Sequence, residues 1–69
     1  MNIKIAERLK ELMEEENLNQ VQLAKRTGLA QNTISAWLAK KKEPSIRSLW
    51  ILADCFGVSV DFLIGRQDY

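Results

Sequence analysis

Apolar residues recur at intervals of three or four along most of this chain, the spacing that places them on one face of an α-helix. The first such segment predicts a helix over about residues 3–16, with Asn2 as its N-cap. Its apolar stripe consists of Ile5, Leu9, Leu12 and Met13. The same pattern predicts four more helices, over about residues 20–27, 31–39, 46–56 and 60–64. We therefore expect an all-α fold: one compact five-helix domain over residues 1–69, with its core in about residues 5–65.

Residues suited to beginning and ending helices lie at the boundaries of these segments. Side chains that can cap a helix N-terminus precede three segments, at Asn19, Ser45 and Ser59. Glycines that can adopt the positive φ of a helix end follow three segments, at positions 28, 57 and 65. The two short helices on either side of Gly28 are predicted to form a tight helix-turn-helix, with Leu29 anchoring the turn in the core.

The second helix of this pair has an apolar face and a polar face. We expect the inward residues of the pair to be Val21, Leu23, Ala24, Ile34, Trp37 and Leu38. The opposite face of the second helix then carries Gln31, Asn32, Ser35 and Ala36. A Gln or Asn amide can hydrogen-bond to N6 and N7 of adenine together, so amides at a helix tip are suited to base edges. This layout predicts a helix-turn-helix that binds double-stranded DNA.

The formal net charge is only +1, but the charges are unevenly distributed along the chain. Residues 17–48 include six basic residues against one acidic residue, whereas the segments before and after are each net negative. The basic residues of this central segment are Lys25, Arg26, Lys40, Lys41, Lys42 and Arg47. A polyanion responds to the local potential rather than to the total charge, so this distribution favours nucleic-acid binding.

The residue inventory argues against catalysis and metal binding. The chain has no histidine and one cysteine, so neither a zinc site nor a nucleophile–histidine pair can be assembled. We therefore expect no enzyme activity, no cofactor and no metal. The apolar runs are too short to cross a membrane, and the N-terminus carries charges too early for a signal peptide. The single Cys55 fits a reducing compartment, so we expect a cytoplasmic protein.

A series of residues in fixed order carries a family resemblance. Along the chain they are Gln20, Leu23, Ala24, Gly28, Leu29, Thr33, Ile34, Ser35, Pro44, Ser45, Leu49, Ala53, Asp54, Gly57, Val58, Ser59, Asp61, Leu63 and Gly65. Each is weakly informative alone, but in this register they resemble the Cro/phage-repressor (XRE) type of helix-turn-helix over about residues 5–65. The resemblance implies a lambda-repressor-like, five-helix domain of bacterial or phage origin that binds duplex DNA, usually as a two-fold dimer.

The resemblance also implies roles for individual positions. Those matching Gln31, Asn32 and Ala36 face bases, and the position matching Gln20 contacts a phosphate. The loop with Lys40, Lys41 and Lys42 and the helix start at Ser45 and Arg47 lie along the DNA backbone. From its place on the same helix face, Ser35 is expected to contact bases, although its hydroxyl can also donate to phosphate or bond back to its own helix. Thr33 is expected to donate its hydroxyl to phosphate.

Four positions depart from the family pattern. Ala30 stands where a capping Ser or Thr is usual, which removes a helix cap. Near the end of the same helix, Leu38 and Lys40 stand where a glutamate and a glycine are common, which leaves the path of the loop to Pro44 open. Ala36 is small where many relatives carry a long polar side chain, so it can only contact a thymine methyl group or leave that base unread.

Self-association is suggested by apolar residues in the C-terminal third. Ile51 and Phe62 stand where relatives usually carry polar residues, and with Val58 they predict an exposed patch that a homodimer covers. Local repacking of a small core is the alternative. Trp50 fits either the core or the surface.

The favoured interpretation is a sequence-specific transcriptional regulator, a repressor that binds an operator inverted repeat as a dimer. One alternative is a protein-interaction module such as an antitoxin or anti-repressor, because the same fold can serve that role. Another is that this chain is the DNA-binding half of a longer repressor.

Overall fold

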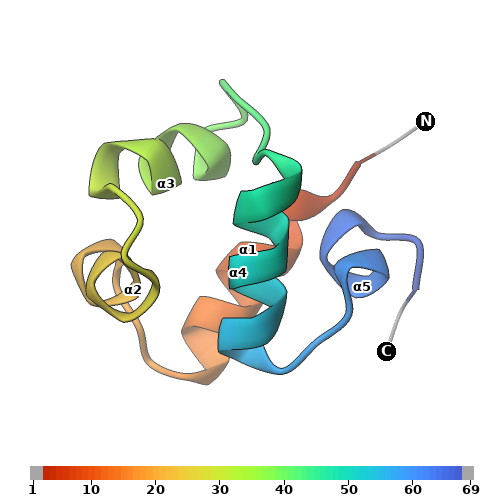
Figure 1. Ribbon diagram of the computed structural model, residues 1–69, viewed down its shortest axis with the longest axis horizontal. Coiled ribbons are helices and arrows are strands. Elements are labelled where there is room, and N and C mark those ends of the chain that lie inside the picture. Colours follow the sequence, from red (N-terminus) through yellow and green to blue (C-terminus); the bar gives the residue numbers. More distant parts are fainter. Residues whose placement is uncertain (1–2, 68–69) are drawn as a thin grey trace.

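The computed structural model describes residues 3–67 and contains five α-helices (Figure 1). They are α1 (Ile5–Glu15), α2 (Gln20–Thr27), α3 (Gln31–Leu38), α4 (Ile46–Phe56) and α5 (Val60–Ile64). No strand occurs within the described residues, so the predicted all-α, five-helix fold is confirmed. Helix α1 begins two residues later than predicted. The N-cap predicted at Asn2 lies outside the described residues, and Lys4 at the observed N-cap position makes no side-chain cap hydrogen bond.

The helices α2 and α3 lie on one side of α4 and the short helix α5 lies on the other (Figure 1). Helix α1 packs against α3 and α5, and α4 packs against α2 and α5. The start of the described chain is tied to α5 by a hydrogen bond from the Lys4 N–H to the Ile64 carbonyl at 3.1 Å. Each helix of the helix-turn-helix is therefore braced by a helix from outside the motif.

One aliphatic side chain from each helix is completely buried in a single cluster. These five residues are Leu9, Leu23, Ile34, Leu52 and Leu63. Full burial of such a side chain contributes about 1.5–3 kcal/mol to the free energy of folding. The cluster therefore couples all five helices, and none of them can shift without opening the same core.

The predicted inward residues are mostly confirmed, with one error. Trp37 is only 2% exposed, and Ala24, Leu29 and Leu38 pack at the edge of the core. Val21, however, is 44% exposed, so its predicted burial was wrong. It precedes the fully buried Leu23 by two residues, and two helical steps turn a side chain to nearly the opposite side of the helix.

The helix-turn-helix is held by local hydrogen bonds at both ends of α2. Asn19 Oδ1 accepts from the Gln22 N–H at 2.8 Å, and Gln22 Oε1 accepts from the Asn19 N–H at 2.9 Å. This reciprocal pair is a capping box. At the other end Gly28 adopts a left-handed conformation (φ 76°), and its N–H donates to the Ala24 carbonyl. The turn therefore depends on a glycine, because the Cβ of other residues makes this left-handed conformation sterically unfavourable.

Helix α3 lacks the side-chain cap that α2, α4 and α5 possess. Ala30 holds the extended backbone of an N-cap (φ −72°, ψ 139°) but offers no oxygen to the first turn. At the corresponding positions, Ser45 accepts from the Ser48 N–H and Ser59 from the Phe62 N–H. The loss of the cap at Ala30, expected from the sequence, is therefore confirmed.

The variant Ala30→Ser is expected to raise the free energy of unfolding by about 0.5–2 kcal/mol, because serine supplies the missing acceptor to a backbone already in the capping conformation. Urea denaturation followed by circular dichroism measures the change. Ala39→Ser, at the exposed opposite end of α3, is the matched control and is expected to leave stability nearly unchanged. Equal stability of Ala30→Ser and the parent chain would contradict this account of the helix start.

Candidate nucleic-acid interface

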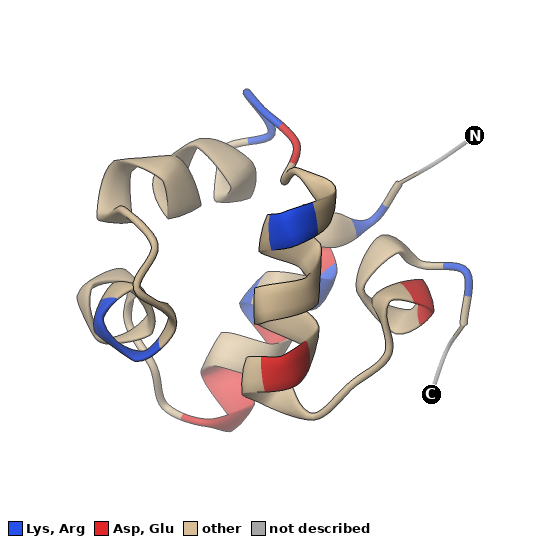
Figure 2. Cartoon of the chain, in the orientation of Figure 1, with Lys and Arg blue, Asp and Glu red and all other residues tan. Residues whose placement is uncertain are grey.

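The first turn of α3 presents two exposed amides. Gln31 and Asn32 are exposed, whereas Thr33, Ser35 and Ala36 are half-buried. The helix has no charged residue from end to end, so it is uniformly tan in Figure 2. Its accessible side chains offer the amides of Gln31 and Asn32 and the methyl group of Ala36. The charges around the helix therefore come from neighbouring segments.

The half-buried hydroxyl of Ser35 is directed at α2. Ser35 Oγ donates a hydrogen bond to Oε1 of Gln20, the first residue of α2. Two residues expected to contact DNA separately, one at a base and one at a phosphate, are thus joined across the helix-turn-helix. The bond uses the only proton of the hydroxyl and the only oxygen of the amide, which leaves the Gln20 amide nitrogen as a donor.

The end of α3 is closed by a lysine in a conformation usually reserved for glycine. Lys40 has a φ of 62°, and its N–H donates to the Trp37 carbonyl at 3.1 Å. The Lys41 N–H donates to the Ala36 carbonyl at 2.9 Å, which completes a Schellman motif. The left-handed conformation of the usual glycine is therefore preserved in this loop even though Lys40 carries a side chain.

The Lys40 side chain is paired with α1. Its Nζ lies 2.7 Å from Oε1 of Glu7, and both side chains are largely exposed. The hydrogen bond from Lys40 lowers the pKa of the Glu7 carboxyl below its usual range. Of the three loop lysines, Lys40 is thus held towards the start of α1, while Lys41 and Lys42 are exposed with no carboxylate of residues 3–67 within ion-pair distance.

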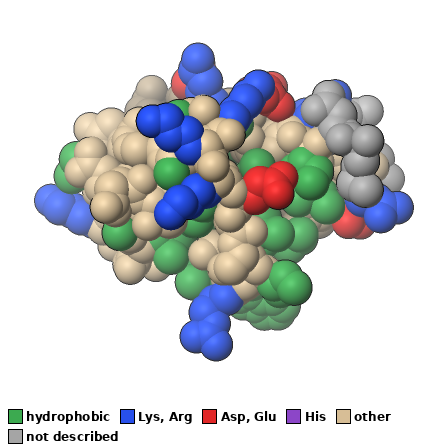
Figure 3. All heavy atoms as spheres, turned by 90° about the horizontal axis from the view of Figure 1, so that it is seen from above, with side chains coloured by type: hydrophobic (Ala, Val, Ile, Leu, Met, Phe, Trp, Pro, Cys, Tyr) green, Lys and Arg blue, Asp and Glu red, His purple; other side chains and the backbone are tan. Residues whose placement is uncertain are grey.

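Positive charge gathers around the C-terminal end of α3, at the other end of the helix from Gln31 and Asn32. Figure 2 shows basic residues in the loop after α3 and in the first turn of α4, where Arg47 is exposed, together with one acidic residue, Glu43, in the same loop. Figure 3, seen from the side on which α3 and its loop lie, shows several Lys and Arg side chains spread over this face. A basic loop therefore follows the helix whose first turn carries the amides.

Two other residues of the basic segment have partners within the fold. Arg26 Nη1 donates to Oε1 of Glu16 at 2.9 Å, so this arginine links α2 to the end of α1. Ser45, expected at a phosphate, caps α4 by accepting from the Ser48 N–H and also donates to Ser48 Oγ, both at 3.1 Å. Its structural task is therefore to begin the helix that carries Arg47.

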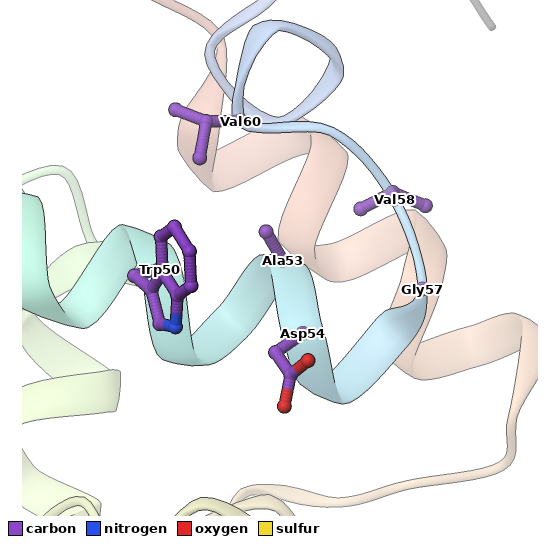
Figure 4. A pocket seen from close by; sticks show the side chains of 6 residues that line it. All are labelled: Trp50, Ala53, Asp54, Gly57, Val58 and Val60. Atoms are coloured by element: carbon purple, nitrogen blue, oxygen red, sulfur yellow. The ribbon is translucent and has the colours of Figure 1, made fainter.

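A second exposed surface lies on α4, away from α3. Ile46 is 88% exposed and Trp50, one turn later, is 73% exposed. Trp50 borders an open groove (Figure 4) whose other lining residues are Ala53, Asp54, Gly57, Val58 and Val60. In this view Trp50 and Ala53 project towards the segment that carries Val58 and Val60, while Asp54 points to the other side. The groove is therefore mainly apolar.

The residues expected at a dimer interface are less exposed than Trp50. Ile51, Val58 and Phe62 are half-buried, and the latter two pack against the core. The Phe62 ring also lies under the Arg8 guanidinium, 4.7 Å from its carbon to the ring centroid. The sequence patterns did not single out Ile46 and Val60 for this surface. The i,i+4 spacing of Ile46 and Trp50, with neither residue in the core stripe, is the signal that identifies the apolar surface.

Comparisons with known proteins place this geometry in a family. A family model described as "Helix-turn-helix" matches residues 9–63, most of the chain. The chain belongs to this helix-turn-helix family. The resemblance to XRE-type proteins deduced from the residue order is thereby confirmed.

Two relatives of this helix-turn-helix chain have informative names. An "Uncharacterized HTH-type transcriptional regulator YobD" of Bacillus subtilis (strain 168) is 36% identical over 62 residues, which is 90% of this chain and 55% of that protein. A crystal structure of a transcriptional regulator from Listeria innocua superposes with a TM-score of 0.85 at 29% identity, covering 94% of this chain and 61% of that one. The chain thus spans a little over half the length of these two relatives.

Two features of other protein classes are missing from residues 3–67. None of the helices in this range is long and apolar enough to cross a membrane. The same range holds no group of three or more His, Cys, Asp or Glu side chains placed to hold a metal ion.

Proposed function

We propose that this chain binds duplex DNA in a sequence-dependent manner and regulates transcription, acting as a repressor that occupies an operator. The observation that carries the proposal is the exposed amide pair in the first turn of α3, Gln31 and Asn32, on a helix-turn-helix scaffold whose second helix is followed by a basic loop. The names of the two relatives, both transcriptional regulators, support the same role. Such a role would be exercised in the cytoplasm of a bacterial cell, on a chromosome or phage genome.

The proposed division of work separates sequence reading from electrostatic attraction. Gln31 and Asn32 contact base edges in the major groove, and Ala36 contacts a thymine methyl group or none. Phosphates are contacted by Gln20, Thr33, Lys41, Lys42, Ser45 and Arg47. Lys40 joins them only to the extent that it leaves its ion pair with Glu7. Each phosphate neutralised by a lysine or arginine releases counterions, so affinity falls steeply as the salt concentration rises.

A homodimer is proposed because a regulator of this kind gains affinity and register from two half-sites. In a two-fold dimer the recognition helices enter successive major grooves about 34 Å apart, and the operator is an inverted repeat. The surface proposed for the partner copy is Trp50 and Val58 with the flanking Ile51 and Phe62. It extends to Ile46, which is exposed, and to Val60, which lines the groove. A two-fold contact uses the same patch on both copies, so an exposed tryptophan meets an apolar groove.

A protein-interaction module, such as an antitoxin or anti-repressor, is the second candidate function. The apolar groove beside Trp50 favours it, since a different protein partner could occupy the same surface. Selection of bound sequences from a random duplex library tests the main proposal against this one. An enriched inverted repeat supports the operator-binding dimer. A chain that retains almost no duplex at moderate salt would favour the protein-interaction module.

The variants Gln31→Ala and Lys41→Ala are expected to fail in different ways. Gln31→Ala removes a base contact, so preference at one position of each half-site falls by about 1–3 kcal/mol. Lys41→Ala removes a phosphate contact, so all sequences bind more weakly and the slope of log K against log salt falls by about 0.9. Fluorescence anisotropy with operator and scrambled duplexes over a salt series measures both. Identical behaviour of the two variants would contradict the division of roles.

The variant Glu7→Gln is expected to strengthen binding to duplexes of any sequence. The substitution breaks the 2.7 Å pair with Lys40, so this lysine becomes available to phosphate and the salt slope steepens by up to about 0.9. Glu15→Gln is the control, because it removes the same charge from an exposed position of α1 that makes no ion pair with Lys40. Equal gains from both variants would mean that total charge, and not the release of Lys40, governs the effect.

The variant Trp50→Ser is expected to shift the protein from dimer to monomer, because it removes the largest exposed apolar side chain of the proposed interface. Sedimentation equilibrium gives the mass over a range of concentrations. Val21→Ser, which removes an exposed apolar residue from α2, is the control and is expected to leave the dimer intact. An unchanged mass for Trp50→Ser would contradict this location and indicate that the dimer interface lies on another surface.

A further inference from the structure

The bond between Ser35 and Gln20 links the two helices of the motif at the side chain that the proposed function assigns to a phosphate. Gln20 is the first residue of α2, and Ser35 lies one turn after Gln31 on α3. Both side chains are half-buried, and Ser35 Oγ donates to Gln20 Oε1. The pair is separated by 15 positions in the sequence, so only the folded helix-turn-helix brings it together.

The rest of Gln20 is held by its surroundings. Its backbone is fixed by the capping box between Asn19 and Gln22 on either side. Its side chain borders a groove whose apolar lining includes Met13, Leu18 and Leu38. The backbone of Gln20 is thus fixed, and the hydrogen bond from Ser35 is the contact that restrains its terminal amide.

The direction of that amide decides whether it can bind DNA. A phosphate oxygen only accepts hydrogen bonds, so the amide must present its nitrogen and turn its oxygen away. An amide rotated by half a turn would present a partial negative charge to the phosphate. Ser35 has a single hydroxyl proton, and by giving it to Oε1 it stabilises the orientation in which the amide nitrogen is the outward donor.

We propose that Ser35 is a positioning residue that fixes the amide of Gln20 as a phosphate donor, in place of the base contact expected from its sequence position. The inference rests on the proposed DNA-binding function and deepens it by assigning Ser35 a role in affinity without a role in sequence preference. The effect differs from that of a lysine, because a neutral amide releases no counterion when it binds phosphate.

The test is a double-mutant cycle of Ser35→Ala and Gln20→Ala, measured by anisotropy on an operator and a scrambled duplex over a salt series. Ser35→Ala is expected to weaken both duplexes by the same factor, roughly twofold to tenfold, with an unchanged salt slope and unchanged base preference. In the Gln20→Ala background the same substitution is expected to have no further effect, because its target is gone. Alanine has the higher helix propensity, so α3 is expected to remain folded.

Two further measurements separate this inference from the DNA-binding proposal. In the free protein, the side-chain NH2 signals of Gln20 in a nitrogen–proton correlation spectrum are expected to move towards random-coil values in Ser35→Ala and to stay in place in Ser35→Thr, which keeps the hydroxyl. Affinity is expected to follow the same pattern. A parent chain that binds no duplex while these NH2 shifts still occur would overturn the proposed function and the phosphate contact of Gln20, but it would leave the orientation of the amide by Ser35 intact. Absence of the shifts in a chain that does bind duplex would overturn the role of Ser35 alone.

Three results would overturn the role of Ser35 while leaving DNA binding intact. The first is parent-level affinity of Ser35→Ala. The second is a changed base preference at one position, which would make Ser35 a base reader. The third is an equal loss from Ser35→Ala with and without Gln20, which would make the two residues independent.

Discussion

The shared burial of one aliphatic residue per helix is the constraint on which the rest of the molecule depends. Leu23 and Ile34 set the angle between α2 and α3, and they are held by Leu9, Leu52 and Leu63 from the three helices outside the motif. A chain of 69 residues has a small core, so each of these side chains is a large part of the net stability. This packing determines the position of α3 and therefore where Gln31 and Asn32 lie.

Local sequence patterns accounted for most of the fold because most of its contacts are local. The periodicity of α3 predicted that Ile34 and Trp37 are buried, and Gly28 marked the turn by its conformational freedom. The predicted burial of Val21 was wrong because the apolar character of a residue does not by itself say which side of a short helix it lies on. The fully buried Leu23 determines which face of α2 points to the core, and Val21 lies on another face.

The side-chain pairs of the candidate site could not be predicted from the sequence. Lys40 meets Glu7 across 33 positions and Ser35 meets Gln20 across 15, and neither pair leaves a periodic trace in the chain. Such pairs depend on how two helices cross, which propensities and spacing do not encode. The exposure of Gln31 and Asn32 was therefore predictable from the sequence, whereas the partners that restrain Lys40 and Ser35 required the structure.

The absence of charge from α3 has a consequence for how such a protein can change over generations. Under the proposed division of roles, substitutions at Gln31 or Asn32 would alter which bases are preferred, while the electrostatic attraction from Lys41, Lys42 and Arg47 would stay constant. A duplicated copy of this chain could thus acquire a new sequence preference through substitutions that do not abolish its affinity for DNA. The core would be untouched by such drift, because both amides are exposed and neither contributes to the buried cluster.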